Sequence, residues 1–367
     1  MSSYEVRNSF KHLVSFYMYV LFCICCYFYY LYFVSDSIHT NEPIYGMFFP
    51  ANIGDHAIYY RNYLDIKNDA FHLDGINNAG VAYIYYLYFS ACEFLLIEHN
   101  PQLLSLILNL FVFFFCFTSF RRIVKSLHLK IEVVWIFVLN SSFWYFAQLI
   151  NKDVFTILIL FKAVEYSILK RLPSIVLLML VSALVRVQLP ILIMVYMFLV
   201  LSKPTIRNFI FVYVAISLIN GYVSRYQTIF IGEETLADGV SSFIYRLNIQ
   251  FGLGSLFLNP LRVVQSFYSV LDSFNYELKY GVDISKIKNI PQLLVMLVFL
   301  PFTIKAFYNY KYYMNTPVKY VMAIVPSFFL VWFLNPTINS RYIMLIIPFF
   351  TLVGLYSYKY KIERSVH

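Results

Sequence analysis

The sequence predicts an all-α integral membrane protein with about ten transmembrane helices, and three observations support this prediction. Sixty percent of the 367 residues are hydrophobic. Only 13% are charged, about half of the roughly 25% that soluble domains carry. The net charge of +9 comes from basic residues in short clusters between long apolar runs. Such clusters orient membrane helices, so the positive charge does not indicate nucleic-acid binding.

The first transmembrane helix is expected from His12 to Val34. This run is too long for the apolar region of a cleavable signal peptide. Arg7 and Lys11 precede it, and basic residues favour the cytoplasmic side, which places the N-terminus inside the cell. The polar residues that follow then begin a first external loop.

This first external loop, residues 35–102, is expected to contain an interfacial helix from Gly80 to Ile97. If that apolar stretch crossed the membrane, the strongest basic cluster of the chain, Arg121 to Lys130, would lie outside. Its many tyrosines and Glu93 suit a helix that lies along the membrane surface. The chain then returns to the cytoplasm from Leu103 to Phe120.

The remaining apolar runs alternate in direction, with basic residues at their inner ends. The outward runs are Ile131–Ile150, Pro173–Val187, Phe209–Val223 and Tyr320–Leu334. The inward runs are Asp153–Leu169, Leu189–Leu201, Ile290–Tyr308 and Arg341–Tyr358. Residues 224–289 form a second, long external loop. Residues 1–367 are therefore predicted to be a single polytopic domain with both termini inside, and no internal repeat is evident.

Most charges at membrane depth gather at the outer face in this topology. They are Asp55, His56, Tyr59 and Arg61 of the first loop, Lys152 and Asp153 of a short turn, Arg186, the loop residues Arg225, Arg246 and Arg262, and Arg341. Arginine presents a rigid fork that matches phosphate oxygens, so the set predicts a site for a polyprenyl-phosphate or polyprenyl-pyrophosphate donor. One carboxylate would serve as general base for an acceptor hydroxyl. No metal site, Gly-rich phosphate loop or Ser-His-Asp order is recognisable.

Structural roles for the same residues stay open. Lys152 and Asp153 could pair to end two helices, with Asp153 as an N-terminal cap. Arg341 could anchor its helix at the lipid headgroups, and the loop residues could simply be solvated. Arg186 lies about one turn inside a span and needs a partner or a ligand. Lys162 and Glu165, one turn apart, are expected to form a structural ion pair.

Several of these features resemble a known family. An Asp in the first external loop, an interfacial helix and a basic inner turn resemble the GT-C fold of polyprenyl-dependent glycosyltransferases. The stretch from Asn140 to Asp153, which contains Phe143-Trp144 and Lys152-Asp153, is similar to a segment of Wzy-type repeat-unit polymerases. Arg186, the long Arg-containing loop and the run from Asn339 to Pro348 also fit that pattern.

The resemblance implies a reaction at the periplasmic face of the bacterial inner membrane, as in O-antigen synthesis for lipopolysaccharide. A growing glycan on undecaprenyl pyrophosphate would be transferred to a new lipid-linked repeat unit, without metal or cofactor. Arg186, Arg341 and Lys152 would stabilise the departing pyrophosphate, and Asp55 or Asp153 would orient or deprotonate the acceptor hydroxyl. His56, Tyr59, Arg225 and Arg246 would bind substrate, and residues 224–289 would cover the site. A chain-length regulator is a further partner that the resemblance allows, whereas nucleic acid is not expected.

Two alternatives remain open at this stage. The first is a GT-C glycosyltransferase that adds a single sugar from a polyprenyl-phosphate donor. The second is a flippase for lipid-linked oligosaccharides, which should have pseudo-symmetric halves and charges along a central cavity. The charges here gather at one face instead, and the halves do not match, so this sequence favours an enzyme.

Overall fold

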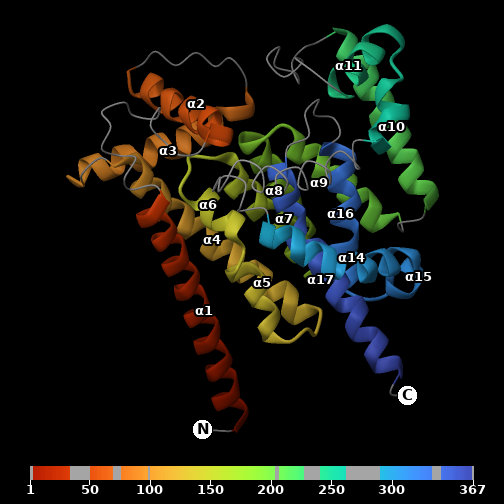
Figure 1. Ribbon diagram of the computed structural model, residues 1–367, viewed down its shortest axis with the longest axis horizontal. Helices are drawn as coiled ribbons and strands as arrows, with labels where there is room; N and C mark the ends of the chain where they lie inside the picture. The colour runs from red at the N-terminus through yellow and green to blue at the C-terminus, as the bar shows by residue number, and fades with distance from the viewer. Residues whose placement is uncertain are drawn as a thin grey trace, which may run out of the picture. The chain divides into compact units, whose positions relative to one another are not determined.

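A computed structural model describes residues 3–33, 50–68, 76–97, 100–202, 206–226, 240–261, 290–332 and 340–365. Helices make up the secondary structure of these ranges, and the described part of the chain contains no strand (Figure 1). The chain forms two compact units. The first comprises Met1–Leu189 with Val282–Gln292, and the second comprises Pro190–Gly281 with Leu293–His367. The predicted all-α fold class is therefore confirmed.

The first unit contains eight α-helices and one short 3-10 helix among its described residues up to Val185. They are α1 (Ser3–Phe33), α2 (Pro50–Lys67), α3 (Ile76–Phe94), α4 (Pro101–Ser126), η2 (Ile131–Val134), α5 (Trp135–Val138), α6 (Ser141–Ala147), α7 (Lys152–Ile168) and α8 (Leu172–Val185). Phe137 of α5 lies at the centre of the aromatic core. Six phenylalanine rings lie with centroids 5.0 to 6.2 Å from it: Phe22, Phe113, Phe117, Phe120, Phe143 and Phe161.

Helices α4 and α7 run in the same direction. Asn109 of α4 contacts Leu149, just before α7, whereas Ser119, ten residues further along α4, contacts Glu165 near the end of α7. Helix α8 runs back along α7, because Arg186 at its end pairs with Asp153 at the start of α7. The predicted topology, in which residues 103–120 and 153–169 both run inward, requires this parallel arrangement.

The expected single helix from Ile131 to Ile150 is not observed, and this part of the prediction was wrong. The segment consists of η2, α5 and α6, with a break at Leu139–Asn140. The break is stabilised locally, since the Asn140 side chain caps α6 by accepting a hydrogen bond from the Phe143 N–H, and Trp144 Nε1 donates to the Val138 carbonyl. Both Val138 and Asn140 are buried, so other parts of the protein surround the interrupted backbone.

The second unit contains most of the remaining helices. They are α9 (Gln188–Leu201), which begins at the boundary, α10 (Ile206–Tyr226), α11 (Val240–Phe251), a helix at 254–261, α14 (Ile290–Tyr308), α15 (Tyr310–Tyr313), α16 (Val318–Trp332) and α17 (Ser340–Ser365). Helices α14 and α17 approach closely at Gly354, where an added Cβ would lie 2.8 Å from Thr303 Oγ1. Thr303 donates a hydrogen bond to the Phe350 carbonyl across the same contact.

Two helices within the described ranges are both long and apolar enough to cross a membrane, Leu13–Leu31 and Pro101–Ser126. Five shorter apolar helices accompany them: Leu172–Val185, Gln188–Leu201, Leu294–Tyr308, Val318–Trp332 and Met344–Lys359. The number of about ten spans therefore stays a prediction.

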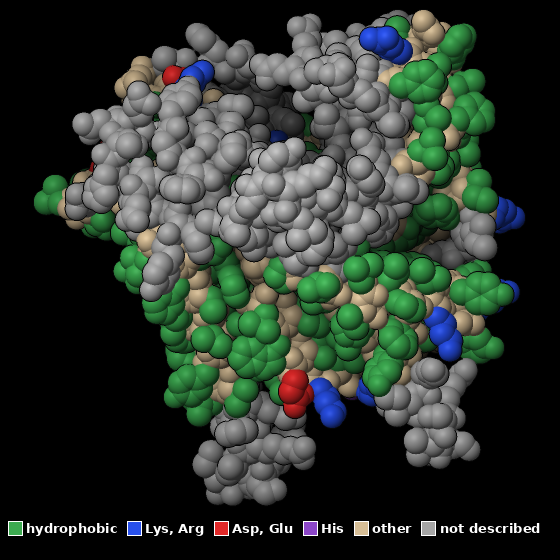
Figure 2. Space-filling model, in the orientation of Figure 1, with side chains coloured by type: hydrophobic (Ala, Val, Ile, Leu, Met, Phe, Trp, Pro, Cys, Tyr) green, Lys and Arg blue, Asp and Glu red, His purple; other side chains and the backbone are tan. Residues whose placement is uncertain are grey.

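Large apolar side chains are exposed over much of the described surface. On α8 they include Leu177, Leu180 and Leu184, each more than half exposed. On the face shown in Figure 2, hydrophobic side chains dominate the described surface and charged side chains are few. A water-facing surface of this kind would associate nonspecifically, so the exposed side chains favour a lipid environment.

Candidate functional site

Arg186 and Asp153 form a buried ion pair where α8 ends and α7 begins. The Arg186 guanidinium lies 3.1 Å from Asp153 Oδ1, and the two side chains are 3% and 0% exposed. Arg186 is the C-terminal cap of α8 and has an extended backbone, which ends the helix at Val185. Two of the three predicted catalytic residues, Asp153 and Arg186, are therefore brought together.

The start of α7 is fixed by Asn151. Its side-chain oxygen accepts a hydrogen bond from the Asp153 N–H at 2.8 Å, so Asn151 is the N-cap, and not Asp153 as one of the structural alternatives proposed. Asp153 lies in the first turn, where the helix dipole favours a negative charge. Its carboxylate is paired with Arg186, and the adjacent Lys152 is half-buried.

Three other helices hold the linker between α6 and α7. Asn109 of α4 donates to the carbonyls of Ala147 and Leu149, at 3.1 and 2.8 Å. Tyr85 of α3 donates to Asn109 Oδ1 at 2.8 Å, and Gln148 donates to the Cys26 carbonyl of α1 at 3.0 Å. These bonds fix the backbone that carries Lys152 and Asp153.

Sequence reasoning did not select Tyr85, Asn109 or Gln148. The available signal was an isolated polar side chain inside an otherwise apolar run, because a polar group at membrane depth is stable only with a hydrogen-bond partner. Asn109 stands out most by this criterion, since hydrophobic residues dominate the run from Leu103 to Phe117.

Helix α3 packs against the end of α8 that carries Arg186. At Gly80 an added Cβ would lie only 2.2 Å from the Leu184 carbonyl oxygen, so the two backbones touch there. This contact places the predicted interfacial stretch, Gly80 to Ile97, beside the ion pair. The stretch is helical, as expected, and α3 extends from Ile76 to Phe94.

Helix α2 packs beside α3 (Figure 1). Tyr63 donates a hydrogen bond to Glu93 at 2.9 Å, and Lys67 forms an ion pair with the same carboxylate at 2.8 Å. Burial of its side chain, reinforced by the bond to Glu93, raises the pKa of Tyr63 above its ordinary value. Tyr63 therefore keeps its proton and remains a donor to Glu93 at neutral pH.

The predicted first-loop residues lie on α2. Asp55 and His56 belong to this helix, but their side chains lie outside the described part of the structure. Tyr59 is buried, which gives its ring a packing role in α2.

The other predicted arginines belong to the second unit. Arg246 is exposed on α11, while Arg225 lies on α10 and Arg341 on α17 with side chains outside the described set. Arg262 lies outside the described residues altogether.

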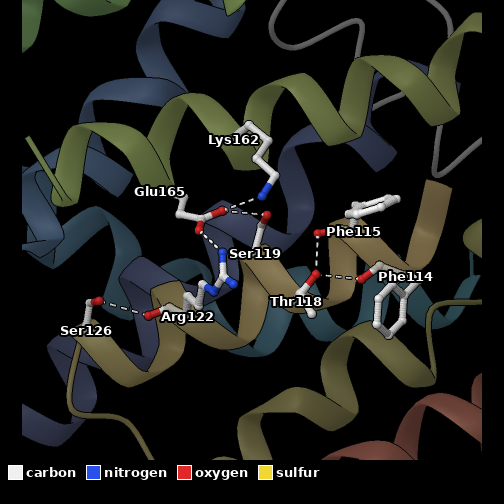
Figure 3. A network of polar contacts seen from close by, with 8 residues as sticks. All are labelled: Phe114, Phe115, Thr118, Ser119, Arg122, Ser126, Lys162 and Glu165. Atoms are coloured by element: carbon white, nitrogen blue, oxygen red, sulfur yellow. Dashed lines mark hydrogen bonds and ion pairs between the residues drawn. The ribbon is translucent and has the colours of Figure 1, made fainter. Parts of the chain in front are cut away.

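A second charged cluster links α4 to the far end of α7. Figure 3 shows Lys162 and Glu165 of α7 facing Ser119 and Arg122 of α4. Glu165 is 2% exposed and accepts bonds from Ser119 at 2.7 Å, Arg122 at 2.5 Å and Lys162 at 2.9 Å. The expected Lys162–Glu165 ion pair is confirmed, and it lies at the opposite end of α7 from Asp153.

The charged groups around Arg186 suit anion binding and proton transfer. Among the described residues, no group of three or more His, Cys, Asp or Glu side chains could hold a metal ion. Arg186 pairs with Asp153, and Lys152 directly precedes Asp153 in the chain. Arginine and lysine are side chains that bind phosphate oxygens.

No known protein family, curated protein or solved structure matches this chain. The function proposed below rests on the chemistry of the described residues and on the sequence motifs.

Proposed function

We propose that this protein is an integral membrane glycosyltransferase that polymerises lipid-linked oligosaccharide repeat units. It transfers the growing glycan from undecaprenyl pyrophosphate to a new lipid-linked repeat unit at the periplasmic face of the bacterial inner membrane. The observation that supports this proposal most strongly is the buried Arg186–Asp153 pair at the junction of α7 and α8. An ionisable group inside a membrane segment is a functional-site hypothesis by default, because its burial is costly.

The donor pyrophosphate is a natural ligand for Arg186. The guanidinium carries five donors in a planar fork, which matches two phosphate oxygens. When the pyrophosphate binds, Arg186 turns from Asp153 to the donor, and Lys152 adds a second positive charge. Both cations stabilise the negative charge that develops on the leaving group.

Release from Arg186 makes the Asp153 carboxylate available as a general base. The carboxylate takes the proton of the acceptor hydroxyl as its oxygen attacks the anomeric carbon of the donor glycan. A new glycosidic C–O bond forms, the C–O bond to the pyrophosphate breaks, and undecaprenyl pyrophosphate leaves with the electron pair. Asp55 is the alternative base in this proposal.

The surroundings of the pair support a site at a membrane surface. The proposed interfacial helix α3 touches α8 two residues before Arg186, through Gly80 and Leu184. The exposed leucines of α8 favour lipid on its outer side. These features support a cationic group close to a membrane surface, where the phosphate of a polyprenyl carrier would lie.

Deletion of the gene in its source strain tests the proposed reaction. The surface polysaccharide, resolved on a gel, should collapse to lipid core with one repeat unit, since synthesis, flipping and ligation still operate. A full ladder with shifted bands would instead indicate a single-sugar transferase. Loss of all repeat units would indicate a flippase, and an unchanged gel would contradict all three.

The role of Arg186 is tested by complementing that deletion with matched variants. Arg171 and Arg186 flank the two ends of α8, but Arg171 is exposed whereas Arg186 is buried. Arg186→Ala should abolish chain growth, and Arg171→Ala should restore the ladder, with both proteins quantified in the membrane fraction. A normal ladder from Arg186→Ala would remove this residue from the mechanism.

A further inference from the structure

The helices at 240–251 and 254–261 carry their apolar side chains on the outside. The exposed residues are Phe243, Ile249, Phe251, Leu253, Phe257 and Leu261, of which Phe257 is 69% exposed. Ile249, Leu253, Phe257 and Leu261 follow one another at intervals of four residues from α11 into the following helix. A helix on a water-soluble protein has the opposite arrangement, with its polar face outward.

Three polar side chains of the same segment are buried on its inner side, whereas Arg246 and Gln250 are exposed. Asn248, Ser255 and Asn259 are almost completely inaccessible. Asn248 Nδ2 donates to Ser255 Oγ at 2.7 Å, and Asn248 Oδ1 accepts the Ser255 N–H at 2.8 Å. Ser255 therefore connects the two helices through a polar seam.

Helix α10 completes this seam from the other side (Figure 1). Asn220 Nδ2 donates to Ser255 Oγ at 2.8 Å, and the Tyr213 hydroxyl donates to the Leu256 carbonyl at 2.5 Å. At Gly221 an added Cβ would lie 1.9 Å from the Gly252 carbonyl oxygen, so the backbones are in contact. Gly252 has a φ of 72°, which lets the chain turn between the two outer helices.

We propose that residues 240–261 form a helical hairpin that is embedded in the bilayer, with its outer face in contact with lipid acyl chains. Small residues at the backbone contact and polar side chains between helices are how helices associate in hydrocarbon. The apolar outer face continues onto α10, where Phe211, Ile219 and Tyr222 are exposed. Lipid acyl chains are therefore the partner that fits the exposed apolar faces of α10 and of the hairpin.

The hairpin is too short to cross the membrane. Helix α11 has 12 residues and spans about 18 Å, against a hydrocarbon thickness of roughly 30 Å. The segment therefore lies in the interface or re-enters on the same side. Arg246 is exposed on α11, and its long side chain reaches the headgroup phosphates while its stem stays in the apolar layer.

Residues 224–289 were predicted to be a long external loop, and the proposal adds to this loop a membrane-embedded element at residues 240–261. The proposal does not depend on glycan transfer, because it follows from the polarity of the hairpin itself.

Spin labelling in proteoliposomes tests the inference. The five native cysteines are replaced by alanine, and single cysteines are introduced at Phe243 or Phe257 for a nitroxide label. Collisions with oxygen, which concentrates in lipid, are compared with collisions with a water-soluble nickel chelate. Leu177 on α8 is the matched lipid-facing control, and the exposed Lys130 is the water-facing control.

Labels at Phe243 and Phe257 should behave like the label at Leu177, with high oxygen and low nickel accessibility. Nickel accessibility equal to that at Lys130 would overturn the hairpin proposal, and so would low accessibility to both reagents, which would mean that protein covers the face. A nickel-accessible Leu177 would contradict the membrane location itself. The hairpin and the proposed function are thus separable.

Discussion

At the scale of single residues, the free-energy cost of replacing the buried Arg186–Asp153 pair depends on whether one partner or both partners are replaced. Two charges removed from water lose several kcal/mol of solvation each, and their mutual attraction offsets most of that loss. Removal of one partner leaves the other charge buried and uncompensated, which costs more than removal of both. This difference in cost allows an experiment to distinguish a structural role of the ion pair from a catalytic role.

Asp153→Asn and Arg186→Ala should each destabilise the protein by about 3–5 kcal/mol, whereas Asp153→Leu combined with Arg186→Met should be close to neutral. Denaturation in mixed micelles measures the difference, with Arg171→Ala as the control. The double variant should fold but produce no polymer. A folded double variant that restores the ladder would show that the pair is only structural.

The Glu165 cluster gives a second prediction at this scale, because its two cations differ in exposure. Arg122 is 59% exposed and Lys162 is 17% exposed, while both contact the same buried carboxylate. Solvent screens the Arg122 pair, so its coupling energy in a double-mutant cycle should be about 0.2–1 kcal/mol. The Lys162 coupling should be larger, about 1–3 kcal/mol. Equal couplings would contradict this ranking.

At the scale of elements, the linker between α6 and α7 is the part that most depends on distant residues. Helices α1, α3 and α4 all contribute hydrogen bonds to it or to Asn109, which binds it directly. The position of Lys152 and Asp153 is therefore set by packing across the first unit, and a substitution far from the ion pair should alter it.

Asn109→Ala should destabilise the protein by about 2 kcal/mol, because it removes the donor to the buried Ala147 carbonyl and leaves the Leu149 carbonyl only the 3.4 Å bond from Tyr85. Tyr85→Phe removes one donor and should cost about 1 kcal/mol. Thr118→Val is the control on the same helix, since Thr118 bonds only to carbonyls of its own helix, at Phe114 and Phe115. Denaturation in micelles measures the order of the three stability changes. An Asn109→Ala variant as stable as the unmodified protein would contradict the proposal that Asn109 holds the linker between α6 and α7.

The local sequence predicts some elements and not others, for physical reasons. Long apolar runs such as Leu103–Phe120 fold as helices because the helix satisfies its own backbone hydrogen bonds. The break at Asn140 could not be predicted from periodicity, because it depends on a side-chain cap and on a surrounding aromatic core. The sequence predicted that Arg186 needs a partner or a ligand, because an arginine inside an apolar run is costly to bury alone. The opposite directions of α7 and α8 follow from the alternation of the runs, but the direct contact between Arg186 and Asp153 depends on how the two helices are rotated and packed, which a linear pattern does not contain.

At the scale of the whole molecule, the directions of α4, α7 and α8 predict which end of the first unit faces the cytoplasm, and this prediction can be tested. The turns after α4 and α7 lie at the same end of the first unit, because these two helices are parallel. Their lysines and arginines favour the cytoplasm. In the proposed topology, the opposite end, with α3 and the ion pair, would face the periplasm.

Single cysteines at Lys130 and Lys170, in these two turns, should resist a membrane-impermeant maleimide in intact cells and react after permeabilisation. A cysteine at Asn68, after the last residue of α2, should react in intact cells. All three positions are exposed in the described structure, so differences in labelling report sidedness. Labelling of Lys130→Cys from outside would reverse the topology and remove the periplasmic site.

The interrupted segment from Ile131 to Ile150 also has a consequence for biogenesis. Each of its pieces is far shorter than the roughly 20 residues of a self-sufficient transmembrane helix, since α6, the longest, has seven. Such short pieces do not partition into lipid on their own as they leave the ribosome. They need the surfaces of α1, α4 and α7 around them, and α7 is synthesised afterwards. In the proposed membrane topology, this segment would stay near the translocon until Ile168 has emerged, so that a later helix would complete the insertion of an earlier one.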